Sequence, residues 1–190
     1  MSLWGMLRLT GHVPPFGGQP GDSRSLESIR RKASRPIVVF PECTTSNGRA
    51  MLRFAEVFGN STLPVKNYNV FIMAARYDPP TLYAPSLTCS IPSPSAFHPL
   101  PHIFKVACSL SPSLYQSLSL RLLTPAESPS SGSFLASDVL TEGGHNDELA
   151  AACAALIAQL GKMRITGQGW EDKIAFLEFY QGKTGRMIGE

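Results

Sequence analysis

The chain has 190 residues, enough for one domain with a sizeable core, and its length gives no reason to expect two. Charged residues make up 16%, well below the usual quarter, so the surface is poor in charge and would suit a membrane or a partner. The balance of 17 Lys and Arg against 14 Asp and Glu gives a net charge of +3, too small to indicate a nucleic-acid-binding protein.

The cysteines and the N-terminus bear on compartment and on metal binding. The four cysteines are widely spaced, with no Cys-x2-Cys pair and no histidine at zinc-finger spacing: Cys43, Cys89, Cys108 and Cys153. We therefore expect reduced thiols in an intracellular protein and no metal site. The apolar N-terminal start soon meets His12 and two prolines, a poor secretory signal, and no window reaches the roughly 18 uninterrupted apolar residues of a spanning helix.

The first predicted element is a short basic helix. Residues 1–21 are rich in Gly and Pro and predict an irregular segment. Asp22, Ser23 or Ser25 could then cap a helix that runs through Ser34. Its last turn is basic, which complements the helix dipole. This favours a solvated helix face over a phosphate or anionic-lipid contact.

Residues 37–77 predict a strand, a helix and a second strand. The run 37–40 is apolar and β-branched, typical of a strand covered on both faces. After the polar stretch 41–49, residues 50–58 place apolar groups at helical spacing, and a second apolar run covers 69–77. A βαβ-like unit of this kind favours an α/β fold with a mostly parallel sheet.

A long excursion follows at 78–101, where seven prolines exclude a continuous helix or a central strand. Its apolar residues leave two interpretations open: a cover over a site or a lipid contact, or an ordered structural insertion. Beyond it we expect a helix over 104–118, a strand over 118–123 and a polar loop over 127–133.

Two structural helices are expected near the C-terminus. Asn146 or Asp147 would cap the first, which ends at Gly161. Its apolar face consists of Leu149, Cys153, Leu156, Ile157 and Leu160. The second runs from Trp170 to about Tyr180.

The polar stretch 41–49 carries the candidate binding residues. If it follows a parallel strand, it lies where ligands collect in α/β proteins, and its amides and hydroxyls could donate to a phosphate while Arg49 adds charge. Equally, Ser46 or Asn47 could simply cap the next helix, because capping and anion binding use the same amides. The candidate substrate-binding residues are Glu42, Thr44, Thr45, Ser46, Asn47 and Arg49.

A family resemblance favours the binding interpretation. The stretch VVFPECTTSNGR resembles the third sequence block of the glycerolipid and lysophospholipid acyltransferases, whose core is Phe-Pro-Glu-Gly-Thr, and especially the fungal lysophosphatidic acid acyltransferases and the related ancient ubiquitous protein. NVFIMAARYDPP is similar to their fourth block. The resemblance is specific over about residues 36–80 and weaker through ESPSSG and TGQGWEDKIAFLEFY.

The resemblance implies transfer of an acyl group from acyl-CoA, a co-substrate rather than a bound cofactor, to the hydroxyl of lysophosphatidic acid or a related lysophospholipid. Glu42, Thr44 and Arg49 would hold the acceptor at an endoplasmic reticulum membrane or lipid droplet surface. Cys43 replaces the family glycine, and Thr45 replaces a frequent basic residue, so Arg49 would supply the charge. Cys43 as a nucleophile is disfavoured, because no histidine is near it in sequence.

The family's catalytic motif, His-x4-Asp, is absent. The residues five positions after His12, His98, His102 and His145 are Gly17, Ile103, Ala107 and Ala150. We therefore expect an N-terminally shortened family member with no catalytic residues, inactive as an isolated chain. Its predicted parts are an irregular segment 1–21, a partial acyltransferase domain 22–141 that includes the insertion 78–101, and a helical segment 142–190. The alternatives are a non-catalytic membrane- or partner-binding protein and an alternatively started gene product.

Overall fold

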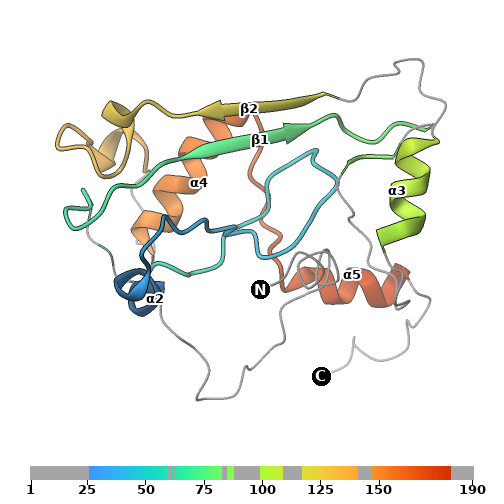
Figure 1. Cartoon of the computed structure of the whole chain (residues 1–190), viewed down its shortest axis with the longest axis horizontal. Coiled ribbons are helices and arrows are strands. Elements are labelled where there is room, and N and C mark those ends of the chain that lie inside the picture. Colours follow the sequence, from blue (N-terminus) through green and yellow to red (C-terminus); the bar gives the residue numbers. More distant parts are fainter. Residues whose placement is uncertain are drawn as a thin grey trace.

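The computed structural model describes residues 26–59, 61, 63–82, 85–87, 99–108, 117–140 and 147–180. Three predicted features lie outside these ranges: the irregular segment 1–21, the helix-cap candidates Asp22, Ser23 and Ser25, and the cap candidate Asn146. The helices are α2 (Leu26–Lys32), α3 (Pro99–Ala107), α4 (Glu148–Gly161) and α5 (Asp172–Tyr180), and the strands are β1 (Met73–Tyr77) and β2 (Leu118–Leu122) (Figure 1). Helices and strands are therefore mixed, as the sequence predicts.

The two strands pair antiparallel, and so the prediction of a mostly parallel sheet is wrong for the described residues. Met73 lies opposite Leu122, and Tyr77 lies opposite Leu118. The apolar runs themselves were correctly predicted as strands. Their relative direction depends on the path of the chain between them, which the pattern of apolar residues within each run does not encode.

The predicted βαβ unit is also wrong, because residues 50–58 are not helical and residues 37–40 form no strand with a partner among the described residues. Instead, the segment around Met51 runs parallel to residues 164–168. The Met51 N–H donates to the Arg164 carbonyl at 2.9 Å, and the Arg53 N–H donates to the Gln168 carbonyl at 2.8 Å. Backbone pairing with a segment more than 100 residues away in sequence overrides the helical spacing of the apolar side chains.

Helix α4 forms as predicted and carries much of the core. Asp147 is its N-cap and accepts a hydrogen bond from the Ala150 N–H at 3.0 Å. The predicted stop shifts by one residue: Gly161 is the last helical residue, and Lys162 takes the left-handed conformation at φ 51°. An added Cβ at Gly161 would lie 2.7 Å from the end of the Met163 side chain, which would have to shift.

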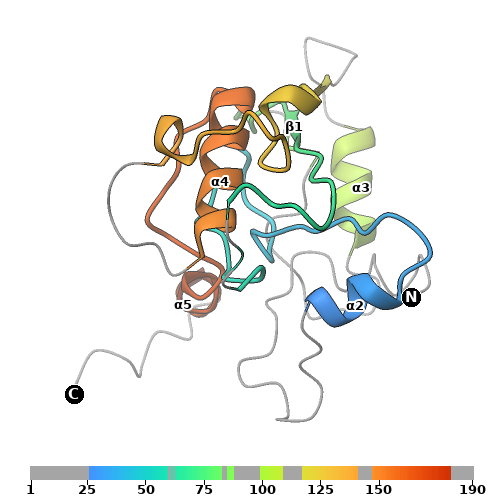
Figure 2. The same ribbon diagram turned by 90° about the vertical axis from the view of Figure 1, so that its left-hand side faces the viewer.

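The core lies between α4 and the strands. Its buried residues are Val65, Ile72, Phe134, Leu149, Ala152, Cys153 and Leu156. Arg76 and Arg121 lie on the sheet face toward α4 and donate to carbonyls at the end of that helix. Arg76 donates to the Gly161 carbonyl at 3.2 Å, and Arg121 donates to the Leu160 carbonyl at 2.8 Å. Figure 2 shows α4 to one side of β1 and α3 to the other. The C-terminal segment thus shares one core with the strands.

The helix predicted over 104–118 begins earlier in the chain, at a proline. α3 begins at Pro99 and ends at Ala107, whereas the sequence predicted a helix over 104–118. Prolines are tolerated in the first helical turn, where the missing N–H has no partner to lose, so a helix can begin inside the proline-rich stretch. Residues 109–116 lie outside the described part.

The remaining predicted elements can be placed more briefly. The strand 118–123 and the last helix are confirmed as β2 and α5. In the polar loop, Ser128 and Ser130 side chains hydrogen-bond both backbone groups of Val70, which closes one end of the core. In the basic helix α2, Arg30 and Arg31 both contact Glu27 at 2.8 Å. Among the described helices, none has the length and apolar character needed to cross a bilayer.

Candidate functional site

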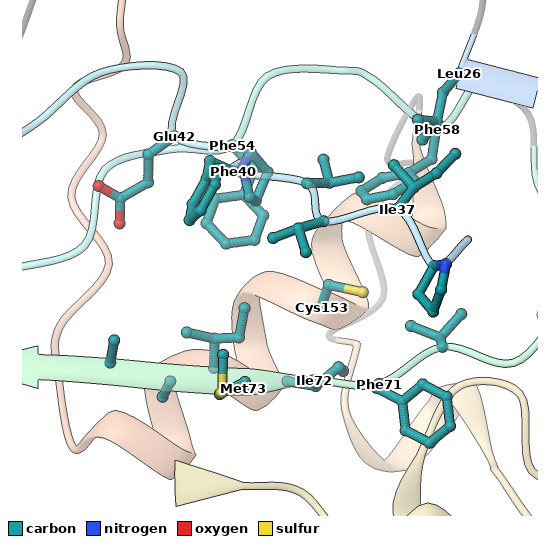
Figure 3. A pocket seen from close by; sticks show the side chains of 18 of the residues that line it. Leu26, Ile37, Phe40, Glu42, Phe54, Phe58, Phe71, Ile72, Met73 and Cys153 are labelled. Carbon is teal, nitrogen blue, oxygen red and sulfur yellow. The ribbon is translucent and has the colours of Figure 1, made fainter. Parts of the chain in front are cut away.

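A wide, mostly apolar crevice separates residues 35–46 from β1. Its volume is about 1380 Å³, above the ~300–1,000 Å³ of typical small-ligand pockets, so it could hold a long ligand. Figure 3 shows Phe40 and Glu42 along one wall and Phe71, Ile72 and Met73 along the other. Cys153 of α4 lies at the back.

The polar turn at one end of this crevice has a demanding backbone geometry. The Cys43 N–H donates to the Phe40 carbonyl at 3.1 Å, which closes a tight turn, and Cys43 itself has φ 54°. L-residues other than glycine rarely adopt this left-handed conformation. Glycine is the residue best suited to this position, and Cys43 occupies it under strain.

Glu42 is a carboxyl group of the crevice wall. Its side chain is largely removed from solvent, and this burial raises its pKa from 4.5 to about 7, although the backbone N–H of Leu52 partly offsets the shift. At neutral pH the carboxyl group is therefore divided between its neutral and charged forms. In its neutral form it can donate a hydrogen bond as well as accept one.

Thr44 contributes a hydroxyl with unused hydrogen-bonding capacity. Its Oγ1 is buried and has no hydrogen-bond partner within the described part of the chain. Buried polar atoms are nearly always paired, so an exception at a crevice wall requires an explanation, and a bound ligand is one. Thr44 lines the crevice together with Glu42.

The structure brings together four of the six predicted binding residues. Glu42, Thr44, Thr45 and Ser46 line the crevice. The lining does not include the other two, Asn47 and Arg49.

Arg49 instead donates to the Pro80 carbonyl at 3.3 Å in an exposed position. Ser46 and Asn47 accept from the backbone two residues onward, at 3.3 Å and 3.1 Å, and so stabilise local turns. Neither caps a helix, because residues 50–58 are not helical.

Sequence reasoning missed Lys173. This lysine of α5 is only 9% exposed, and its Nζ donates to the Thr45 carbonyl at 2.8 Å. The Nζ also lies 5.7 Å from the centre of the Phe176 ring. Lys173 precedes Phe176 and Leu177 by three and four residues, so it shares their helix face, and that spacing was the signal available in the sequence.

The remaining ionisable groups give no sign of a metal centre. Among the described residues, no three His, Cys, Asp or Glu side chains lie close enough to hold a metal ion. Burial raises the pKa of the Cys43 thiol, and the charge of Glu171 adds to that shift, which makes the thiolate less accessible. Comparison with protein-family models, with curated proteins and with solved structures found no match.

Proposed function

We propose that this chain binds a lysophospholipid in the crevice, as a partial glycerolipid acyltransferase. The main support for this proposal is the combination of a large apolar crevice with a polar turn at its end. Apolar walls suit an acyl chain, because its burial contributes about 0.8 kcal/mol per CH₂ group. The polar turn suits a glycerol-phosphate head. The sequence resemblance supports the same ligand class.

Two groups of the turn would hold the head group. A rotation of the Thr44 side chain would bring its buried, unpaired hydroxyl to the ligand without breaking an existing hydrogen bond. Glu42 in its neutral form can donate to a phosphate or glycerol oxygen, and in its charged form it repels phosphate. Binding of the phosphate ester is therefore expected to strengthen as pH falls through about 7.

The family reaction transfers an acyl group from acyl-CoA to lysophosphatidic acid or a related acceptor. It uses a His-x4-Asp pair as general base, and none of the four histidines has the aspartate at that spacing. We propose that the chain keeps acceptor binding and does not turn over by itself. The expected location is an endoplasmic reticulum membrane or lipid droplet surface.

Calorimetric titration with lysophosphatidic acid below its micelle concentration tests this function. We expect saturable binding that Glu42→Ala or Thr44→Val weakens, while Glu56→Ala, which removes an exposed carboxylate outside the crevice lining, does not. Absence of saturable binding would refute the proposal. Robust turnover with labelled acyl-CoA, lost in Glu42→Ala, would contradict the expected inactivity.

A second candidate function is non-catalytic binding to a membrane or partner, and the outer face of the sheet favours it. Paired residues of antiparallel strands share a face, so Met73, Leu120 and Leu122 lie opposite the face that contacts α4, and Met73 and Leu122 also border the crevice. Their side chains are 56%, 58% and 62% exposed. Flotation with anionic vesicles tests membrane binding, and failure to float would count against it.

A further inference from the structure

Lys173 is the most buried lysine among the described residues, and it contacts the polar turn from the side of α5. Buried lysines are rare unless their charge is satisfied. Here the Nζ donates to the Thr45 carbonyl at 2.8 Å, and the Phe176 ring lies 5.7 Å away. A hydrogen bond from an ammonium group is stronger than a neutral one, and low solvent access strengthens it further.

The contact depends on a brace formed by the stretch 164–173. Backbone pairing of Met51 and Arg53 with this stretch brings it alongside the segment that follows the turn. The Thr166 N–H donates to the Met51 carbonyl at 2.9 Å. The Asp172 carboxylate accepts from the Gly169 N–H at 2.7 Å, where the chain enters α5. The next residue is Lys173.

A second contact holds the same two segments together. Arg53 and Glu171 form an ion pair at 3.4 Å, with both side chains partly exposed. A bond of this kind is weak on its own. Here the ion pair serves to position the chain, because it joins Arg53, in the segment after the turn, to Glu171, two residues before Lys173. The brace therefore fixes the distance over which the lysine side chain reaches the turn.

We infer that Lys173 is the positioning residue of the candidate binding turn, through its hydrogen bond to the Thr45 carbonyl. By holding the Thr45 carbonyl, it fixes the backbone that presents Thr44 and Glu42 to the crevice. It also helps retain Cys43 at φ 54°, a strained conformation that persists only when its surroundings determine it. Lys173 does not line the crevice, so its effect on a ligand passes through the turn.

This inference rests on the proposed function only for its ligand; the effect on the turn itself is measured without one. The Cys43 N–H, bonded to the Phe40 carbonyl at 3.1 Å, reports opening of the turn through hydrogen–deuterium exchange. We expect Lys173→Met to accelerate that exchange about tenfold or more, and Lys173→Arg to restore most of the protection. Lys105→Met, which removes an exposed lysine of α3, should leave the exchange unchanged.

Two further measurements separate local positioning from general stability. Exchange through local opening is nearly independent of low denaturant concentrations, whereas exchange through global unfolding is not. If Lys173→Met does not fold, Lys173→Gln replaces it, since it keeps a neutral donor. Lys173→Gln is expected to exchange faster than Lys173→Arg. Equal exchange in these two variants, or unchanged exchange in a folded Lys173→Met, would overturn the inference.

Titration with lysophosphatidic acid distinguishes this inference from the proposed function. Weaker binding in Lys173→Met, with recovery in Lys173→Arg, supports both. Faster turn exchange in Lys173→Met without any lipid binding by the wild-type chain supports the positioning role and refutes the proposed ligand. Wild-type binding that Lys173→Met leaves unchanged, despite faster exchange, overturns the link between the turn and the ligand.

Discussion

The buried carboxyl of Glu42 makes the stability of this chain depend on pH in a predictable direction. Burial raises its pKa from 4.5 to about 7 in the folded state. Between those values the folded state binds more protons than the unfolded state, so the free energy of unfolding falls as pH rises. The contribution of the neutral Glu42 carboxyl to the free energy of unfolding is fully present below about pH 4.5 and is lost by about pH 7.

The size of the effect follows from the same two pKa values. The interval from 4.5 to about 7, at about 1.36 kcal/mol per pKa unit, corresponds to about 3 kcal/mol. Because the side chain keeps some contact with solvent, this is an upper limit. Glu42→Gln removes the titration and retains the shape, so it should stabilise the chain at pH 8 by up to about 3 kcal/mol and have little effect near pH 4.5.

Urea unfolding of both chains at pH 4.5 and pH 8 measures this difference. Glu56→Gln is the matched control, because it removes an exposed carboxylate from the neighbouring stretch 50–58. The reasoning is refuted if Glu42→Gln changes the free energy of unfolding equally at both pH values. It is also refuted if Glu56→Gln reproduces the pH-dependent part.

Two further changes test the local geometry. Asp147 accepts hydrogen bonds from the backbone N–H groups of Phe58 at 2.9 Å and Ala150 at 3.0 Å. Asp147→Ala should therefore lower the free energy of unfolding by about 2–4 kcal/mol. A loss under about 1 kcal/mol in urea unfolding would contradict this double role. Cys43→Gly should relieve about 1–2 kcal/mol of left-handed strain and lose about 0.5–1 kcal/mol to chain entropy, for a net gain of up to about 1.5 kcal/mol. Cys43→Ala keeps the strain, and equal stabilities of the two variants would contradict this account.

The elements that sequence reasoning predicted well depend on local interactions. Asp147 caps α4 through a bond to an amide three residues onward, and the apolar face of that helix repeats within each turn. Strands β1 and β2 are short apolar runs bounded by polar or proline-containing stretches. Each of these signals lies within a few residues of the element that it predicts.

The predictions that proved wrong depend on partners distant in sequence. The apolar spacing of 50–58 is compatible with a helix and with an extended segment. The choice was made by the bonds from Met51 and Arg53 to residues 164–168. The direction of the sheet was decided in the same way, by the pairing of β1 with β2. Nothing within either run specifies such a partner.

The same division applies to the candidate site. The sequence alone identified the polar turn and the absence of a His-x4-Asp pair. It also named Glu42, Thr44, Thr45 and Ser46 as candidates, and these four line the crevice. Only the tertiary structure shows that Cys43 is left-handed, that Glu42 is buried enough to raise its pKa, and that Lys173 reaches the turn from 128 residues away. Residue types and local spacing are properties of the chain, whereas burial and long-range contacts exist only once distant segments pack together.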